Sequence, residues 1–170
     1  MSTKVCGIIE LNKIDIQRQE KTLLYFFIVD KATSSGIGII LGPKVFSGFL
    51  QKRKHSLWEI PFELADDPTD VNAECLFTGD GIEMYSSGIR IDTGESLSSR
   101  MTRVQNFLEN LLMSKLIKMI TLDINFIDMD EDTVEIIEIK ANDFCKKMIE
   151  LYQHKDNWTP VVRVVIKHDR

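Results

Sequence analysis

Apolar stretches in the N-terminal half of the chain have the length and residue types of β-strands. Residues 4–10, 22–29 and 37–41 are rich in Ile, Leu, Val, Phe and Tyr, and we expect each to form a strand. Between the last two, residues 33–36 supply Thr, Ser, Ser and Gly, which favour turns. The pattern therefore predicts an antiparallel hairpin with a loop of several residues.

Two further segments before the middle of the chain carry weaker β signals. Residues 57–64 are apolar enough for a strand, but Pro61 lacks an N–H donor and is expected at a sheet edge or a bulge. Residues 83–91 hold small residues at 86–88 between short apolar pairs, which indicates a compact hairpin.

The clearest element is a helix over residues 98–119. Its apolar residues recur every three or four positions, so they form one stripe along a helix. We expect one continuous helix with Leu108, Leu111 and Leu112 buried. The stripe consists of Met101, Val104, Phe107, Leu108, Leu111, Leu112 and Leu116.

The C-terminal third predicts strands over 120–127 and 133–140, the first with strict alternation of apolar and polar residues. The acidic segment 128–132 between them favours a hairpin. Asn142 or Asp143 can cap a second, shorter helix, whose inner face holds Phe144, Met148, Ile149 and Tyr152. A last strand is expected over 160–168.

This order of elements lacks the regular β-α alternation of a doubly wound sheet. It predicts an α+β fold with a mostly antiparallel sheet, one long helix and one shorter helix. The 170 residues, 44% of them hydrophobic, suit a single globular domain spanning residues 1–170.

Composition limits where the protein works. The first residues lack the long apolar region of a signal peptide, and the longest apolar runs fall well short of the roughly 20 residues that span a bilayer. We therefore expect a cytoplasmic protein that does not insert into a membrane. Cys6, Cys75 and Cys145 are widely spaced without a C-x-x-C pair, so we expect reduced thiols, with Cys145 as a buried apolar residue.

Motifs for cofactors and catalysis are incomplete. The glycines of residues 36–42 miss the spacing of a dinucleotide-binding turn. The aspartates of 128–132 begin like a calcium loop, but Thr133 and Ile139 occupy positions where that loop needs Gly and Glu. His55, His154 and His168 have no partner at helical spacing. We therefore expect no cofactor, no metal and no enzymatic activity.

The strongest departure from an ordinary surface is the distribution of charge. Between His55 and Ile89 there are eight carboxylates and no Lys or Arg, and between Met119 and Ile139 there are seven carboxylates and again no Lys or Arg. If both stretches fold onto one face, their field attracts a basic partner. The residues expected to bind it are Asp66, Asp67, Asp70, Glu74, Asp128, Asp130, Glu131 and Asp132.

In size, acidity and absence of a catalytic motif, the chain resembles bacterial toxin-immunity proteins. The resemblance implies an inhibitor that blocks a basic toxin domain, such as a nuclease. A net charge of −5 and a pI near 5.3 disfavour binding to nucleic acid.

Two alternatives stay open. One is a secretion chaperone or assembly adaptor that acts as a homodimer through an apolar surface, although the sequence does not define the oligomeric state. The other is an enzyme whose residues meet only in the fold, with Cys75, His55, Asp66 and Glu83 as candidates.

Overall fold

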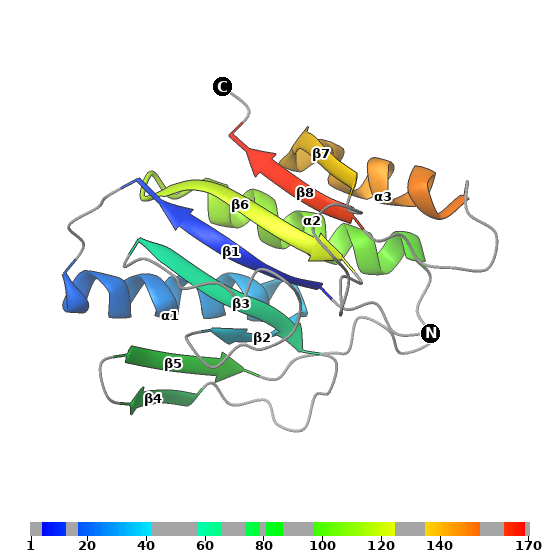
Figure 1. Ribbon diagram of the computed structural model, residues 1–170. Helices are drawn as coiled ribbons and strands as arrows, with labels where there is room; N and C mark the ends of the chain where they lie inside the picture. Colours follow the sequence, from blue (N-terminus) through cyan, green and yellow to red (C-terminus); the bar gives the residue numbers. More distant parts are fainter. Residues whose placement is uncertain are drawn as a thin grey trace.

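A single mixed sheet joins the strands of the computed structural model, which describes residues 5–12, 17–41, 58–65, 74–78, 81–86, 97–124, 135–153 and 162–168. In this part of the chain, eight strands lie in the order β4-β5-β2-β3-β1-β6-β8-β7 (Figure 1). Only β7 and β8 are parallel, so the expected α+β fold with a mostly antiparallel sheet is confirmed. The strands are β1 (Val5–Leu11), β2 (Gly38–Leu41), β3 (Glu59–Ala65), β4 (Glu74–Thr78), β5 (Gly81–Ser86), β6 (Ile117–Ile124), β7 (Glu135–Lys140) and β8 (Val162–Lys167).

The three α-helices formed by the described residues lie on the same side of the sheet, behind it in Figure 1. They are α1 (Arg18–Ser34), α2 (Leu97–Leu112) and α3 (Phe144–Gln153), the last preceded by the short 3-10 turn η3 (Ala141–Asp143). Each helix joins two strands that run in the same direction. The two strands joined by α2 run opposite to those joined by α1 and by α3. The chain also crosses the sheet from left to right of the strand order through α2, but from right to left through α1 and α3. Crossovers of one hand therefore place all three helices on one face. None of the described helices is long and apolar enough to cross a membrane.

The core lies between this sheet face and the helices. Alternate strand residues such as Ile9, Leu122 and Val164 point into it and are fully buried. The Phe62 ring from β3 meets the Phe107 ring from α2 edge to face, with centroids 6.3 Å apart. Ile8 is also buried but does not belong to this core, because its side chain lies on the other face of β1.

The first predicted hairpin is wrong, because residues 22–29 belong to α1 rather than to a strand. The buried residues Leu24, Tyr25, Ile28, Val29 and Ala32 follow a helical spacing. Leu23 and Phe26, which lie between them, are exposed. Apolar residues therefore surround much of the helix and hide its period, so the run resembles a buried strand.

Two predictions of strand position are also wrong. β3 lies between β2 and β1, so Pro61 is not on an edge strand. Leu41, the last described residue of β2, pairs with Phe62, so no described β2 residue lies opposite Pro61 and its missing N–H. β6 and β7 do not form a hairpin, since β8 lies between them and pairs with both.

The remaining boundaries agree more closely. α2 ends at Leu112 rather than at residue 119, and a turn leads into β6. In that turn the Ser114 Oγ accepts the Leu116 N–H. Leu108 and Leu111 are buried as expected, whereas Leu112 is half-buried. Residues 87–91, the second half of the other predicted hairpin, lie outside the described residues.

Candidate functional site

The direction of each strand determines which connections lie at the same end of the sheet. Because β1 is antiparallel to both β3 and β6, these two strands finish where β1 begins. The same reasoning across the sheet shows that β5 also finishes there and that β2, β4, β7 and β8 begin there. We call this the Val5 end, which lies to the right in Figure 1, and the opposite one the Leu11 end.

Both acidic stretches contain connections that are joined to strands at the Val5 end. Residues 66–73 connect β3 to β4, and residues 125–134 connect β6 to β7. Glu63 and Asp123 both pair with Cys6, so β3 and β6 finish about 10 Å apart, at two strand spacings. Of the expected partner-binding residues, Glu74 begins β4 at this end, whereas Asp66, Asp67, Asp70, Asp128, Asp130, Glu131 and Asp132 lie outside the described residues.

The longest basic connection is joined to the opposite end. Residues 42–57 link the last residue of β2 to the strand β3, both at the Leu11 end. The segment carries Lys44, Lys52, Arg53 and Lys54 and no carboxylate, and it too lies outside the described residues. The two strongly acidic connections and this basic connection are thus joined to opposite ends of the sheet.

One ion pair is buried near the Val5 end. The Arg163 Nε donates to the Asp123 Oδ1 at 2.8 Å, and its Nη2 donates to Oδ2 at 3.3 Å. The residues face each other across β6 and β8, on the sheet face opposite the helices. Asp123 has no exposed surface, and the arginine compensates its buried charge. A buried pair without net charge suits a structural role.

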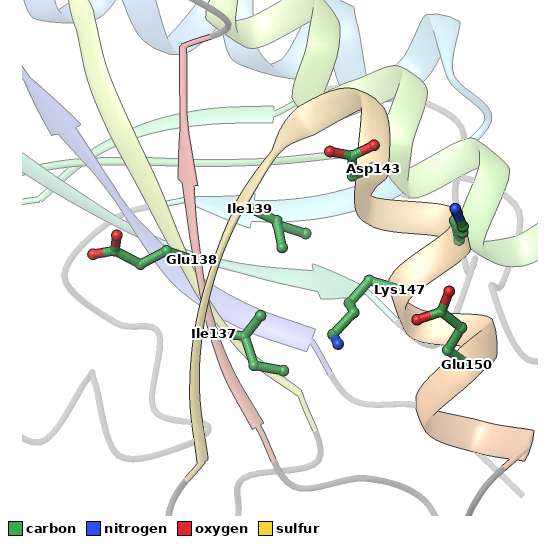
Figure 2. A pocket seen from close by; sticks show the side chains of 7 residues that line it. Ile137, Glu138, Ile139, Asp143, Lys147 and Glu150 are labelled. Atoms are coloured by element: carbon green, nitrogen blue, oxygen red, sulfur yellow. The ribbon is translucent and has the colours of Figure 1, made fainter.

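A groove of about 360 Å³ separates the edge strand β7 from α3 (Figure 2). Ile137 and Ile139 line it from the strand, and Lys147 reaches toward it from the helix. The Glu138 side chain points away from α3, and its carboxylate lies 3.4 Å from the Lys167 ammonium. Glu138 nevertheless lines the groove, so we infer that the groove reaches the strand backbone. Asp143, Lys146 and Glu150 complete the lining.

Cys145 has a structural setting at the start of α3. Gln105 of α2 accepts the Cys145 backbone N–H at 2.8 Å and so satisfies one of the free donors of the helix N-terminus. The thiol is half-buried rather than fully buried, 3.5 Å from the Thr102 hydroxyl. Phe144 and Met148 beside it are in the core as expected.

Sequence reasoning missed both the groove and the ion pair. The only signal for the pair is Arg163 within the run 161–165, which otherwise consists of valine. Nothing in the sequence indicates the groove, because it requires the placement of β7 at the sheet edge. Of the candidate enzyme residues, His55 and Asp66 lie outside the described residues, as do the side chains of Cys75 and Glu83.

Within the described ranges, no three His, Cys, Asp or Glu side chains converge as ligands for a metal ion. No protein-family model, curated protein or solved structure shows significant similarity to the chain.

Proposed function

We propose that the protein binds a basic protein partner through the Val5 end of its sheet and inhibits it, in the manner of an immunity protein acting on a toxin domain. One observation supports this proposal above the others: both acidic connections are joined to strand ends at the same end of the sheet. Carboxylates gathered at one end produce a field that steers a cationic partner into contact.

The opposite charges of the connections at the two ends of the sheet strengthen the proposal. With acidic connections joined to one end and the basic segment 42–57 joined to the other, a cationic partner is attracted to one end and repelled from the other. The modest net charge of −5 conceals this difference. Association should therefore be oriented as well as fast.

Two triple substitutions test the proposal, one in each acidic connection. The first is Asp66→Asn, Asp67→Asn and Asp70→Asn, and the second is Asp128→Asn, Asp130→Asn and Asp132→Asn. A matched control removes three carboxylates in or next to elements at the Leu11 end, through Glu10→Gln, Glu20→Gln and Asp169→Asn. All three variants change the net charge equally, so only the position of the charge differs.

The measurement is the association rate with a partner captured by the wild-type chain from its native cells and then purified. Each acidic triplet should lower this rate by roughly tenfold at low salt, and the control should leave it nearly unchanged. The wild-type rate should fall as salt shortens the screening length to about 8–10 Å. Wild-type rates and salt dependence in both acidic variants would rule out the acidic end as the binding surface.

A second candidate is an assembly adaptor that forms a homodimer, favoured by an exposed apolar pair on α1. Leu23 is 65% exposed and Phe26 is 50% exposed, and their i,i+3 spacing places them on one side of the helix. Light scattering tests this candidate. A dimer that becomes monomeric on Leu23→Ser with Phe26→Ser supports it, whereas a wild-type monomer contradicts it.

A further inference from the structure

We propose that the outer edge of β7, together with the groove beside α3, binds an extended peptide segment of a partner protein, which adds a strand to the sheet. This site is separate from charge-based capture at the Val5 end and does not depend on it. It rests on three features of the described residues: a strand edge with no strand partner among them, a groove with two isoleucines on its strand side, and balanced charges on its helix side.

Among the described residues, no strand pairs with the outer edge of β7. β7 ends the sheet order, and within the described part of the chain β8 is its only strand neighbour. Edge strands present a row of N–H and C=O groups, which another extended backbone complements. Ile136 on this strand has 61% of its surface exposed, between the charged residues Glu135 and Glu138 of the same edge.

The groove specifies side chains at alternate positions of the peptide. Ile137 and Ile139 both point toward α3 and are two residues apart, about 7 Å along the strand (Figure 2). A peptide paired with β7 places its own alternate residues beside them on the same face. These peptide residues meet isoleucine, so they should be apolar.

The α3 side of the groove favours neither a positively nor a negatively charged peptide. Lys146 and Lys147 lie among Asp143 and Glu150, so the α3 side of the groove carries balanced charges. The expected occupant is therefore a strand with apolar, uncharged residues facing the groove. It need not be the strongly basic surface that suits the Val5 end.

A second copy of the chain is a less suitable occupant than a peptide. The two-fold axis that pairs two β7 edges in antiparallel fashion is perpendicular to the sheet, so both α3 helices lie on the same face. Figure 2 shows α3 next to the edge strand β7, across the groove that both line. The helices of two copies would then converge over the shared edge, whereas a peptide strand brings no helix.

The test uses a fluorescent six-residue peptide of alternating valine and threonine, capped at both ends, and measures fluorescence anisotropy with the full chain. A scrambled peptide of the same composition is one control. Two further peptides carry N-methyl groups on either the odd or the even residues. Because strand N–H groups alternate between the two edges, only one methylated set should abolish binding, and the other should bind like the parent.

A substitution in the groove provides the second arm. Lys147→Trp fills the groove from α3, and Lys115→Trp is a matched control at an exposed lysine outside it. Lys147→Trp should weaken binding by roughly tenfold or more, and Lys115→Trp should leave it unchanged. If Lys147→Trp fails to fold, the methylated peptides still decide the question with the wild-type protein.

Several outcomes overturn the proposal: no saturable binding of the alternating peptide, equal binding of both methylated peptides, or equal binding by the Lys147→Trp variant. A wild-type dimer that Lys147→Trp converts into a monomer also overturns it, because a second copy then occupies the edge. Triple neutralisation of 66–70 or 128–132 should leave peptide binding intact. The experiments therefore distinguish an error in the proposed peptide site from an error in the proposed acidic binding surface.

Discussion

The two faces of the sheet are stabilised by different interactions, although the same strands form both. On the helix-covered face, residues such as Ile120, Leu122 and Val164 are fully buried in the apolar core between the sheet and the helices. On the other face, the neighbouring positions hold the Asp123–Arg163 ion pair. Two further ion pairs on this face, Glu10 with Lys118 and Glu138 with Lys167, are more exposed than that pair.

Burial does not distinguish the two faces, because Asp123 is as buried as the core residues beside it. What differs is the kind of group buried. Apolar side chains gain free energy simply by leaving water, whereas a buried carboxylate costs free energy unless a cation compensates it. The helix-covered face should therefore dominate stability, and the other face should depend on intact pairs.

The largest effect is expected from Phe107→Ala on the helix-covered face. Phe107 is fully buried and packs edge to face on Phe62, so its removal leaves a cavity and should cost about 3–5 kcal/mol of unfolding free energy. Denaturant unfolding measures this loss, with the exposed neighbour Asn106→Ala as a control that should change little. A loss below about 1 kcal/mol would show that α2 is not part of the core.

Breaking the buried pair should have an effect almost as large. Asp123→Ala removes the carboxylate that pairs with the buried Arg163 guanidinium, which should cost about 3–5 kcal/mol. The double variant Asp123→Leu with Arg163→Met should recover most of that loss, because both charges are removed together. Equal losses in the single and double variants would mean that packing, not charge compensation, matters at this position.

The contrast between α2 and α1 explains how much of the fold the sequence predicts. In α2, buried Val104, Leu108 and Leu111 alternate with polar residues, so the helical period is visible. In α1, Leu23 and Phe26 interrupt the buried positions with exposed apolar residues, so the period is lost. Local patterns identify an element only when its two sides differ in polarity.

Prediction from the sequence is also limited by the pairing of strands that lie far apart in the chain. The alternation in β6 predicts a strand correctly, but nothing local shows that β8 inserts between β6 and β7. Charge in the two acidic stretches is visible in the sequence, whereas their shared sheet end follows only from strand directions. The groove beside β7 depends entirely on that same non-local order.

Stability at alkaline pH should depend on Tyr25, a buried residue of α1. Burial raises the pKa of Tyr25 above its ordinary value of 10.0. Above pH 10 the unfolded chain loses this proton while the folded chain keeps it, so stability should fall by up to about 1.4 kcal/mol per pH unit. Denaturant unfolding at pH 9 and pH 11 should show a smaller fall in Tyr25→Phe. Identical pH dependence in both proteins would contradict the burial of this hydroxyl.

The smallest effect is expected from the exposed pair of β7 and β8, which is the counterpart of the buried pair on the same face. The Lys167 ammonium lies 3.4 Å from the Glu138 carboxylate, and both side chains are more than half exposed. Water and salt screen such charges, so a double-mutant cycle of Lys167→Ala and Glu138→Ala should give a coupling of about 0–1 kcal/mol. The coupling should shrink further in high salt. A value close to that of Asp123 with Arg163 would mean that position on this face, rather than burial, determines the strength of its ion pairs.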